Sequence, residues 1–437
     1  MNPSRHGSLL QLDPHTKKRN AAEKRFRLYG LFAIGIALFA LAILLVSIIS
    51  NGASSFRQTY LSFPVTISAA EIEGAETALL KTGAYNKIIQ TSLLAYLIEN
   101  DLMQDTHEAD AFGMISEEAG ATFRRFIFAN PDAAGTTFQM NLLANGRIDG
   151  YFKGRVTAQT ALLDKNVTPK QLVLADRLAA QGALVKRFNW EFFTNPDASD
   201  NRPEAAGLGV AILGSLYMMA VVLCLALPIG VAASIYLEEF ARKNWITDVI
   251  EVNIANLAAV PSIVYGILGL AIFINFAELN QSSPLVGGLV LTLMTLPTII
   301  ISTRASLKSI PPSIRDAALG VGASKMQSVL HHVLPLAAPG ILTGTIIGLA
   351  QALGETAPLL LIGMVAFVKE YPAAWSPDAG LFGEASTALP VQVFNWTQRS
   401  DPAFVERASG AIITLLIFLL IMNALAIFLR KKFERRW

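Results

Sequence analysis

The sequence predicts an all-α, polytopic membrane protein with six transmembrane helices, and its composition, its apolar runs and its charge distribution all support this fold class. The chain has 437 residues, of which 53% are hydrophobic and 16% are charged, whereas soluble proteins carry about 25% charged residues. Long apolar runs occupy residues 28–49, 208–237, 252–276, 284–303, 336–368 and 409–429. Each run is long enough to cross a hydrocarbon core of about 30 Å as a helix.

The basic residues next to the first and last runs predict the orientation of the chain. They are Arg5, Lys17, Lys18, Arg19, Lys24, Arg25 and Arg27 before the first run, and Arg430, Lys431, Lys432, Arg435 and Arg436 after the last. By the positive-inside rule both termini are expected in the cytoplasm. A basic arm that binds nucleic acid is the alternative for the N-terminal segment. We expect lipid and no nucleic acid as its partner, because juxtamembrane basic residues already have an explanation in the membrane topology.

This topology divides the chain into five parts. Residues 1–27 are a basic cytoplasmic tail, 28–50 the first transmembrane helix, and 51–206 a domain and linker outside the cytoplasm. Residues 207–430 form a core of five transmembrane helices, and 431–437 are a second cytoplasmic tail.

The domain 51–206 is expected to be α+β or mostly helical and separable from the membrane core. Residues 86–103 and 168–188 have the apolar spacing of helices, whereas 129–138 and 143–154 have the composition of turns. No set of residues in this domain indicates a chemical reaction. The single cysteine of the chain, Cys224, rules out an intrachain disulfide, and no spacing of Cys and His predicts a metal site.

Motifs for catalysis are missing from the sequence. It contains no G-x-x-x-x-G-K-[ST] phosphate loop and no Ser-His-Asp or Cys-His pattern. We therefore expect neither enzymatic activity nor a cofactor, and ATP hydrolysis, if the protein uses it, must take place in a separate subunit.

A polar segment, "RDAALGVGASKMQSVLHHVLP", lies between the fourth and fifth runs on the predicted inner face. Pro311 and Pro312 precede it, and Ser313 is the expected N-cap of a short helix. The "GVG" stretch favours a tight turn before a second helix. A short helix–turn–helix on the membrane surface is suited to insertion into a groove of another protein.

This segment, residues 310–335, resembles the coupling loop of ABC importer permeases, in which E-A-A-x-x-x-G is followed nine residues later by I-x-L-P. Here Asp316 replaces Glu, which keeps the charge, and His332 replaces Ile. The resemblance implies that an ATPase is contacted by Arg315, Asp316, Ala317, Ala318, Gly320, Gly322, Leu334 and Pro335.

Neighbouring stretches narrow the resemblance to the PstA permeases of phosphate ABC importers. They are "GVAASIYLEEFARKNW", "NLAAVPSIVYGILGL", "LAQALGETAPLLLIG" and "LPVQVFNW". The resemblance covers the first span and everything from about residue 189 onward. It implies an inner-membrane complex in bacteria with a PstC-like permease, two PstB-like ATPase subunits and a PstS-like periplasmic phosphate-binding protein. ATP binding would then drive alternating access through the coupling loop.

The expected translocation path centres on Glu355, the only ionisable residue between 333 and 368. A charge at mid-membrane costs about 2.5–3.5 kcal/mol, so Glu355 must face a cavity or a partner, or else be a protonated residue that holds helices together. Gln351 shares its helix face and Thr356 can donate to an oxyanion. Gln351 stands where relatives often have Arg, so the cation must come from Arg304 or from the partner permease. Arg304 is equally compatible with an anchor at the inner face; Ser302 and Thr303 beside it are further donors.

Two other functions remain open at this point. One is a permease for another oxyanion, such as phosphonate, sulfate or molybdate. The other is a membrane scaffold or sensor whose outer domain binds a signal, although the spacing of the coupling loop argues against it.

Overall fold

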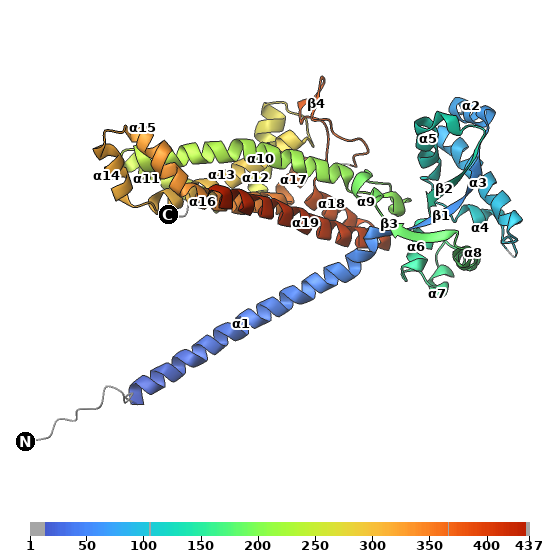
Figure 1. Ribbon diagram of the computed structural model, residues 1–437, viewed down its shortest axis with the longest axis horizontal. Helices are drawn as coiled ribbons and strands as arrows, with labels where there is room; N and C mark the ends of the chain where they lie inside the picture. The colour runs from blue at the N-terminus through green and yellow to red at the C-terminus, as the bar shows by residue number, and fades with distance from the viewer. Residues whose placement is uncertain (1–13, 105, 366, 434–437) are drawn as a thin grey trace, which may run out of the picture. The chain divides into compact units, whose positions relative to one another are not determined.

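A computed structural model describes residues 14–104, 106–365 and 367–433 (Figure 1). Its contacts divide the chain into two units, one ending at Asn51 and the other beginning at Gly52, and each is described by itself. The described part of the first unit is helix α1, Pro14–Gly52, which has 39 residues and whose last residue is the first residue of the second unit. At 1.5 Å per residue α1 is about 58 Å long, which exceeds the hydrocarbon core. The helix therefore includes basic residues that the sequence places in a tail before residue 28.

The second unit begins with a sheet domain of three antiparallel strands in the order β2-β1-β3. The strands are β1 (Arg57–Thr66), β2 (Thr137–Leu143) and β3 (Leu184–Phe188). Pro64 in the central strand lacks a backbone N–H, and it lies beyond the stretch Arg57–Leu61 that pairs with β3, so no ladder bond is lost there. Leu61, Phe63 and Val65 alternate into the core of this domain.

Helices cover the sheet and complete an α+β domain. They are α2 (Ala69–Thr77), α3 (Lys81–Glu99), α4 (Glu108–Phe112), α5 (Ala119–Ala129), α6 (Gly146–Phe152), α7 (Ala158–Ala161) and α8 (Pro169–Ala180). Two sequence expectations are wrong here. The helix expected over 168–188 ends at Ala180, because Gly182 has φ +75° and the chain turns into β3. Part of the turn expected over 143–154 is helix α6, which the side chain of Asn145 caps.

The membrane core contains the remaining long helices. They are α10 (Gly209–Ile235), α11 (Trp245–Ala258), α12 (Ser262–Gly269, continued by a π-helical stretch, Leu270–Phe276), α13 (Pro284–Lys308), α16 (Leu334–Gly354) and α19 (Pro402–Phe433). Shorter elements join them, namely α9 (Glu191–Thr194), α14 (Pro312–Gly320), α15 (Lys325–Ser328), α17 (Ala357–Leu361), β4 (Trp375–Ser376), β5 (Gly380–Leu381) and α18 (Leu389–Gln398).

Small residues let α13 pack closely between α10 and α16. A Cβ on Gly288 would lie 2.5 Å from Val221 of α10, and a Cβ on Gly344 of α16 would lie against the side chain of Ser302. Close packing through glycine is a general device of membrane helices, because lipid provides no hydrophobic drive for helix association.

Two of the six expected spans are not single straight helices. The run 252–276 bends by 101° between α11 and α12, so the described residues contain five helices that can each cross a membrane, or up to six spans if the bent pair counts as one. Pro261 explains the bend, because it cannot donate a helical hydrogen bond. The run 336–368 is divided into two helices. The first, α16, ends at Gly354, the backbone is extended at Glu355, and the second helix, α17, then begins.

Candidate functional site: a coupling segment, a broken helix and a buried joint

The segment that resembles a coupling loop forms a helical hairpin at the inner end of the core. Helix α14 has Pro311 as its N-cap residue, so the expected cap at Ser313 is wrong, and Ser313 lies inside the helix. Gly322 adopts φ +89°, which turns the chain into α15. Ser324 caps α15 in a capping box with Gln327, and a π-helical turn, Val329–Val333, joins α15 to α16.

The residues expected to contact an ATPase divide into exposed and anchoring groups. Asp316, Ala317, Gly320 and Gly322 are exposed on the hairpin, together with the apolar side chains of Leu319 and Val321. Ala318 is buried, and Leu334 packs on the cluster of Leu307, Val333, Ala337 and Ile341; Pro335, half-buried, follows it in α16. Arg315 points back toward α10, where its guanidinium binds the carboxylate of Glu239 with N–O distances of 2.6 to 3.2 Å. The hairpin thus presents a mixed polar and apolar surface, while Arg315 and Leu334 hold it to the membrane core.

Glu355 lies at the break between α16 and α17 and is half-buried. Thr356 beside it precedes α17, and Gln351 is exposed one turn earlier on α16. Within the described part of the chain the carboxylate of Glu355 has no hydrogen bond or ion pair. Helix α12 packs against α17, since a Cβ on Gly266 would lie 2.7 Å from Pro358. Two interrupted helices therefore meet near Glu355, and interrupted membrane helices occur where backbone lines a cavity or protein interior.

Arg304, Ser302 and Thr303 do not share a site with Glu355. Ser302 is level with Gly344, which is eleven positions before Glu355 and hence about 16 Å away along the helix axis. Arg304 is bound to Glu238, at 3.5 Å, and closely to Glu251. Thr303 is fully buried and its hydroxyl has no partner among the described residues. Arg304 therefore joins α13 to α10 and α11 at the inner end of the core.

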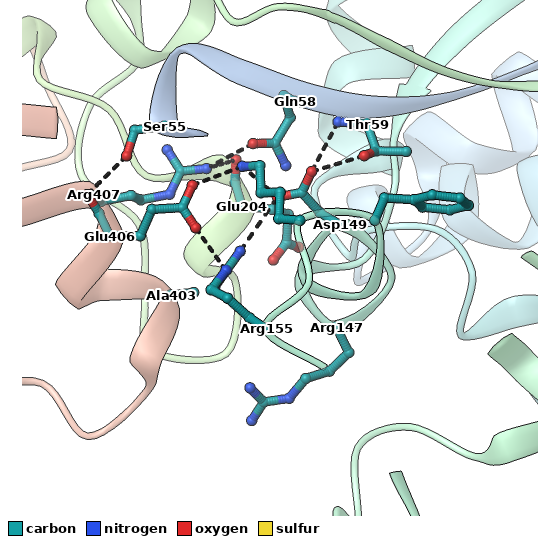
Figure 2. A network of polar contacts seen from close by, with 12 residues as sticks. Ser55, Gln58, Thr59, Arg147, Asp149, Arg155, Glu204, Ala403, Glu406 and Arg407 are labelled. Carbon is teal, nitrogen blue, oxygen red and sulfur yellow. Dashed lines mark hydrogen bonds and ion pairs between the residues drawn. The ribbon is translucent and has the colours of Figure 1, made fainter. Parts of the chain in front are cut away.

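A buried polar cluster, which we call the joint, connects the sheet domain to the start of α19 (Figure 2). The amino group of Lys153 lies 2.7 Å from Asp149 and 2.9 Å from Glu406 of α19, and Arg155 lies 2.7 Å from the other oxygen of Glu406. Asp149 in turn accepts hydrogen bonds from the backbone and hydroxyl of Thr59 at 3.0 and 2.9 Å. Helix α6, where the sequence predicts a turn, thus carries the central carboxylate.

Arg407 completes the joint by holding the linker before α10. Its guanidinium donates to the carbonyls of Ala206 and Glu204 at 2.6 and 2.7 Å and to the side chain of Gln58 at 3.2 Å. Burial raises the pKa of the Glu204 carboxyl to about 7, although a hydrogen bond from Ser116 opposes this shift. An adjacent apolar core adds Phe192, Trp396 and Phe404. The domain is therefore fixed to α19 rather than flexibly tethered. The sequence indicates this contact only through Glu406 and Arg407, two charges at the start of an apolar run.

Two stretches of the chain match known protein families. Residues 226–437 match the family described as "Binding-protein-dependent transport system inner membrane component", and residues 13–161 match "Domain of unknown function (DUF3333)". The chain is 32% identical over 234 residues to the phosphate transport system permease protein PstA of Yersinia pestis, which covers 53% of this chain and 76% of the relative. The chain belongs to the PstA family of ABC importer permeases.

Another relative of the permease is the probable ABC transporter permease protein YqgI of Bacillus subtilis (strain 168). It is 30% identical over 251 residues, which are 55% of this chain and 83% of the relative. Among solved structures, a chain of the inward-facing MetNI methionine ABC transporter aligns with a TM-score of 0.40 and 15% identity, over 52% of this chain and 97% of that chain. A chain of a bacterial transporter that imports the acidic polysaccharide alginate aligns with a TM-score of 0.39 and 14% identity, over 52% of this chain and 79% of that chain.

Membership of this family has three consequences. The permease is a multi-pass protein of the inner membrane. It is a transport component and not a catalytic one. It works with ATPase subunits and a periplasmic binding protein, as ABC importer permeases do.

Proposed function

We propose that this permease forms half of the translocation path of an ATP-driven importer of inorganic phosphate. The observation that carries the proposal is the 32% identity to a phosphate transport permease over 234 residues. The coupling hairpin supports the ATP-driven part, because it exposes Asp316 to Gly322 while Arg315 anchors it. The other half of the path would come from a PstC-like permease, with two PstB-like ATPases at the hairpins and a PstS-like protein that delivers phosphate.

The proposed orientation places both termini and the hairpin in the cytoplasm and the sheet domain in the periplasm. The hairpin follows the end of α13, whereas the sheet domain joins the start of α10 and α19, so the two lie at opposite ends of the core (Figure 1). Basic residues Arg430, Lys431 and Lys432 close α19 at the hairpin end, as the positive-inside rule requires for a cytoplasmic side.

Within the path, we assign Glu355 to a gate and not to phosphate binding, since a carboxylate repels an anion. Its place at a break between two helices suits an element that changes its backbone as the path opens. Gln351 and Thr356 would line the same region, while Ser302, Thr303 and Arg304 would act nearer the inner end. Because Arg304 is bound to two carboxylates, the cation that attracts phosphate would come from the partner permease.

Uptake of radiolabelled phosphate tests the proposal. The complete complex is placed in vesicles with ATP. Uptake of the labelled phosphate is then measured in competition with unlabelled phosphate, phosphonate, sulfate or molybdate. We expect saturable, ATP-dependent uptake that only unlabelled phosphate displaces at low concentration. Preferential displacement by another oxyanion would identify a permease for that anion. A complex that binds the ATPase but moves no oxyanion would favour a scaffold or sensor.

A further inference from the structure

Helix α10 ends in a π-helical turn, Tyr236–Phe240, that carries the adjacent carboxylates Glu238 and Glu239. A single π turn inside a helix is uncommon and frequently marks a functional position. Adjacent residues on a helix point in different directions, about 100° apart. Glu238 and Glu239 accordingly bind different parts of the core.

Glu239 binds the first coupling helix. Its Oε1 atom lies 3.0 Å from Nε and 2.6 Å from Nη2 of Arg315, and its Oε2 atom lies 3.2 Å from Nε. The side chain of Glu239 is only 6% exposed. Arg315 also donates to the carbonyls of Leu307, at 2.9 Å, and Ile310, at 2.8 Å. One guanidinium therefore joins α14, the end of α13 and the end of α10.

Glu238 binds the spans themselves. It lies 3.5 Å from Arg304 and 3.7 Å from Lys308 of α13, and Arg304 also binds Glu251 of α11. The two neighbouring carboxylates thus make a continuous chain of charge contacts from the coupling helix through α10 to α13 and α11.

The contact between α14 and α10 depends on this ion pair. A cavity of about 420 Å³ lies beside it, lined by Glu238, Glu239, Arg315, Asp316 and Lys325 among others. In the described ranges, no other side chain of α14 makes a hydrogen bond or ion pair with α10. Lys325 of α15 adds a contact over the ring of Phe240 at 5.3 Å. Ile235 of α10 and Ile310 before α14 belong to one apolar cluster, and the forked ion pair adds a directional contact that constrains both the distance and the angle between α14 and α10.

We propose that Glu239 is a positioning residue that transmits the displacement of α14 to α10 through Arg315. This inference rests on the proposed function, since it assumes that an ATPase moves the hairpin. Two parallel N–H···O bonds constrain rotation as well as distance. The pair therefore makes α14 and the end of α10 move together, and the Glu238–Arg304–Glu251 contacts carry the movement to α13 and α11.

The first test compares ATP hydrolysis with phosphate uptake in vesicles that contain the complete complex. Glu239→Gln keeps the size of the side chain and removes its charge, and Arg315→Lys keeps the charge but loses the fork. We expect Glu239→Gln to assemble normally and to hydrolyse ATP within about twofold of the wild type, with at least about a tenfold rise in ATP used per phosphate. In Arg315→Lys, the ATP used per phosphate should lie between the values of the wild type and of Glu239→Gln. The matched control is Glu99→Gln, the same change at an exposed glutamate of the sheet domain, which should leave the ratio unchanged.

A second test measures movement without reference to the substrate. In a Cys224→Ser background, spin labels at Ser313→Cys and Tyr236→Cys report the distance between α14 and the end of α10. We expect this distance to stay fixed on ATP binding in the wild type and to change in Glu239→Gln.

The outcomes separate the inference from the proposed function. In one outcome, the wild-type complex imports no phosphate, yet its label distance stays fixed on ATP binding and changes in Glu239→Gln. This result rules out phosphate as the substrate and supports the inference. Normal phosphate uptake combined with an unchanged ATP ratio and a fixed distance in Glu239→Gln overturns the inference alone. A parallel loss of assembly and both activities in Glu239→Gln and Arg315→Lys, with the ratio unchanged, shows a purely structural pair and also overturns it.

Discussion

Replacing Gly322 by valine should uncouple the hairpin through backbone strain alone. Gly322 has φ +89°, and an added Cβ would meet no atom within 4 Å. The penalty therefore comes from the conformation and not from a clash. A non-glycine residue at positive φ costs about 1–3 kcal/mol, and a β-branched residue lies at the upper end of this range.

A penalty of about 2–3 kcal/mol shifts the balance between this turn and any alternative by roughly 30- to 150-fold. Because the turn sets the angle between α14 and α15, we expect Gly322→Val to reduce phosphate uptake strongly while membrane insertion stays normal. Gly322→Ala should have a smaller effect. The experiment measures three quantities together: the initial uptake rate, the amount of permease in the membrane and the amount of co-purified ATPase.

Gly320 provides a matched control two positions away. It has the same open surroundings but no positive φ, and it is the last residue of α14. Gly320→Ala should therefore fold without strain and support the helix, by up to about 1 kcal/mol, so a loss of ATPase binding in this variant would report the added methyl group on the docking surface and not backbone strain. Normal uptake and normal ATPase co-purification by Gly322→Val would refute the reasoning.

Three further predictions concern Glu355, Glu204 and Arg407. Glu355→Gln should abolish or strongly reduce phosphate uptake without loss of assembly, and Glu355→Asp should retain part of it; normal uptake by the Gln variant would leave Glu355 as a neutral packing residue. Because burial raises the pKa of Glu204 to about 7, the folded protein keeps a proton that the unfolded chain loses above its ordinary pKa of 4.5, so stability should fall as pH rises from about 4.5 to 7, by at most about 3 kcal/mol. Melting temperatures across this range should show a weaker pH dependence in Glu204→Gln, and an equal dependence would contradict the assignment. Arg407→Met leaves three buried acceptors without their donor and should destabilise the joint by a few kcal/mol, since each unsatisfied buried acceptor costs about 1–3 kcal/mol. Faster proteolytic release of the sheet domain would report this, and unchanged release would show that apolar packing holds the joint.

The joint also changes what a deletion of the sheet domain should do. The sequence alone predicts a separable domain. In the structure such a deletion removes Lys153 and Arg155 from Glu406, and Gln58 from Arg407, which leaves charges of α19 without their partners. Removal of one side of a buried charge pair is strongly destabilising. A shortened chain therefore requires substitutions at both α19 positions to remain stable.

The sequence by itself determines the membrane class of this protein, its apolar runs and its coupling hairpin. The length of an apolar run and its helical period are local properties of the sequence. In lipid such a run must be helical, because every backbone polar group has to form its hydrogen bond within the segment. The hairpin follows from its prolines and from Gly322, whose backbone requirement is also local.

The tertiary structure decides the features that depend on partners distant in the sequence. Pro261 accounts for the bend locally, but the packing of α12 against α17 next to the break at Glu355 is visible only in the folded chain. Arg304 and Arg315 look alike in the sequence, yet one binds Glu238 and Glu251 and the other binds Glu239. Asp149 and Glu406 are 257 positions apart and share Lys153. Charge pairing is long-range in sequence and short-range in space, so only the folded chain shows which carboxylate each cation binds.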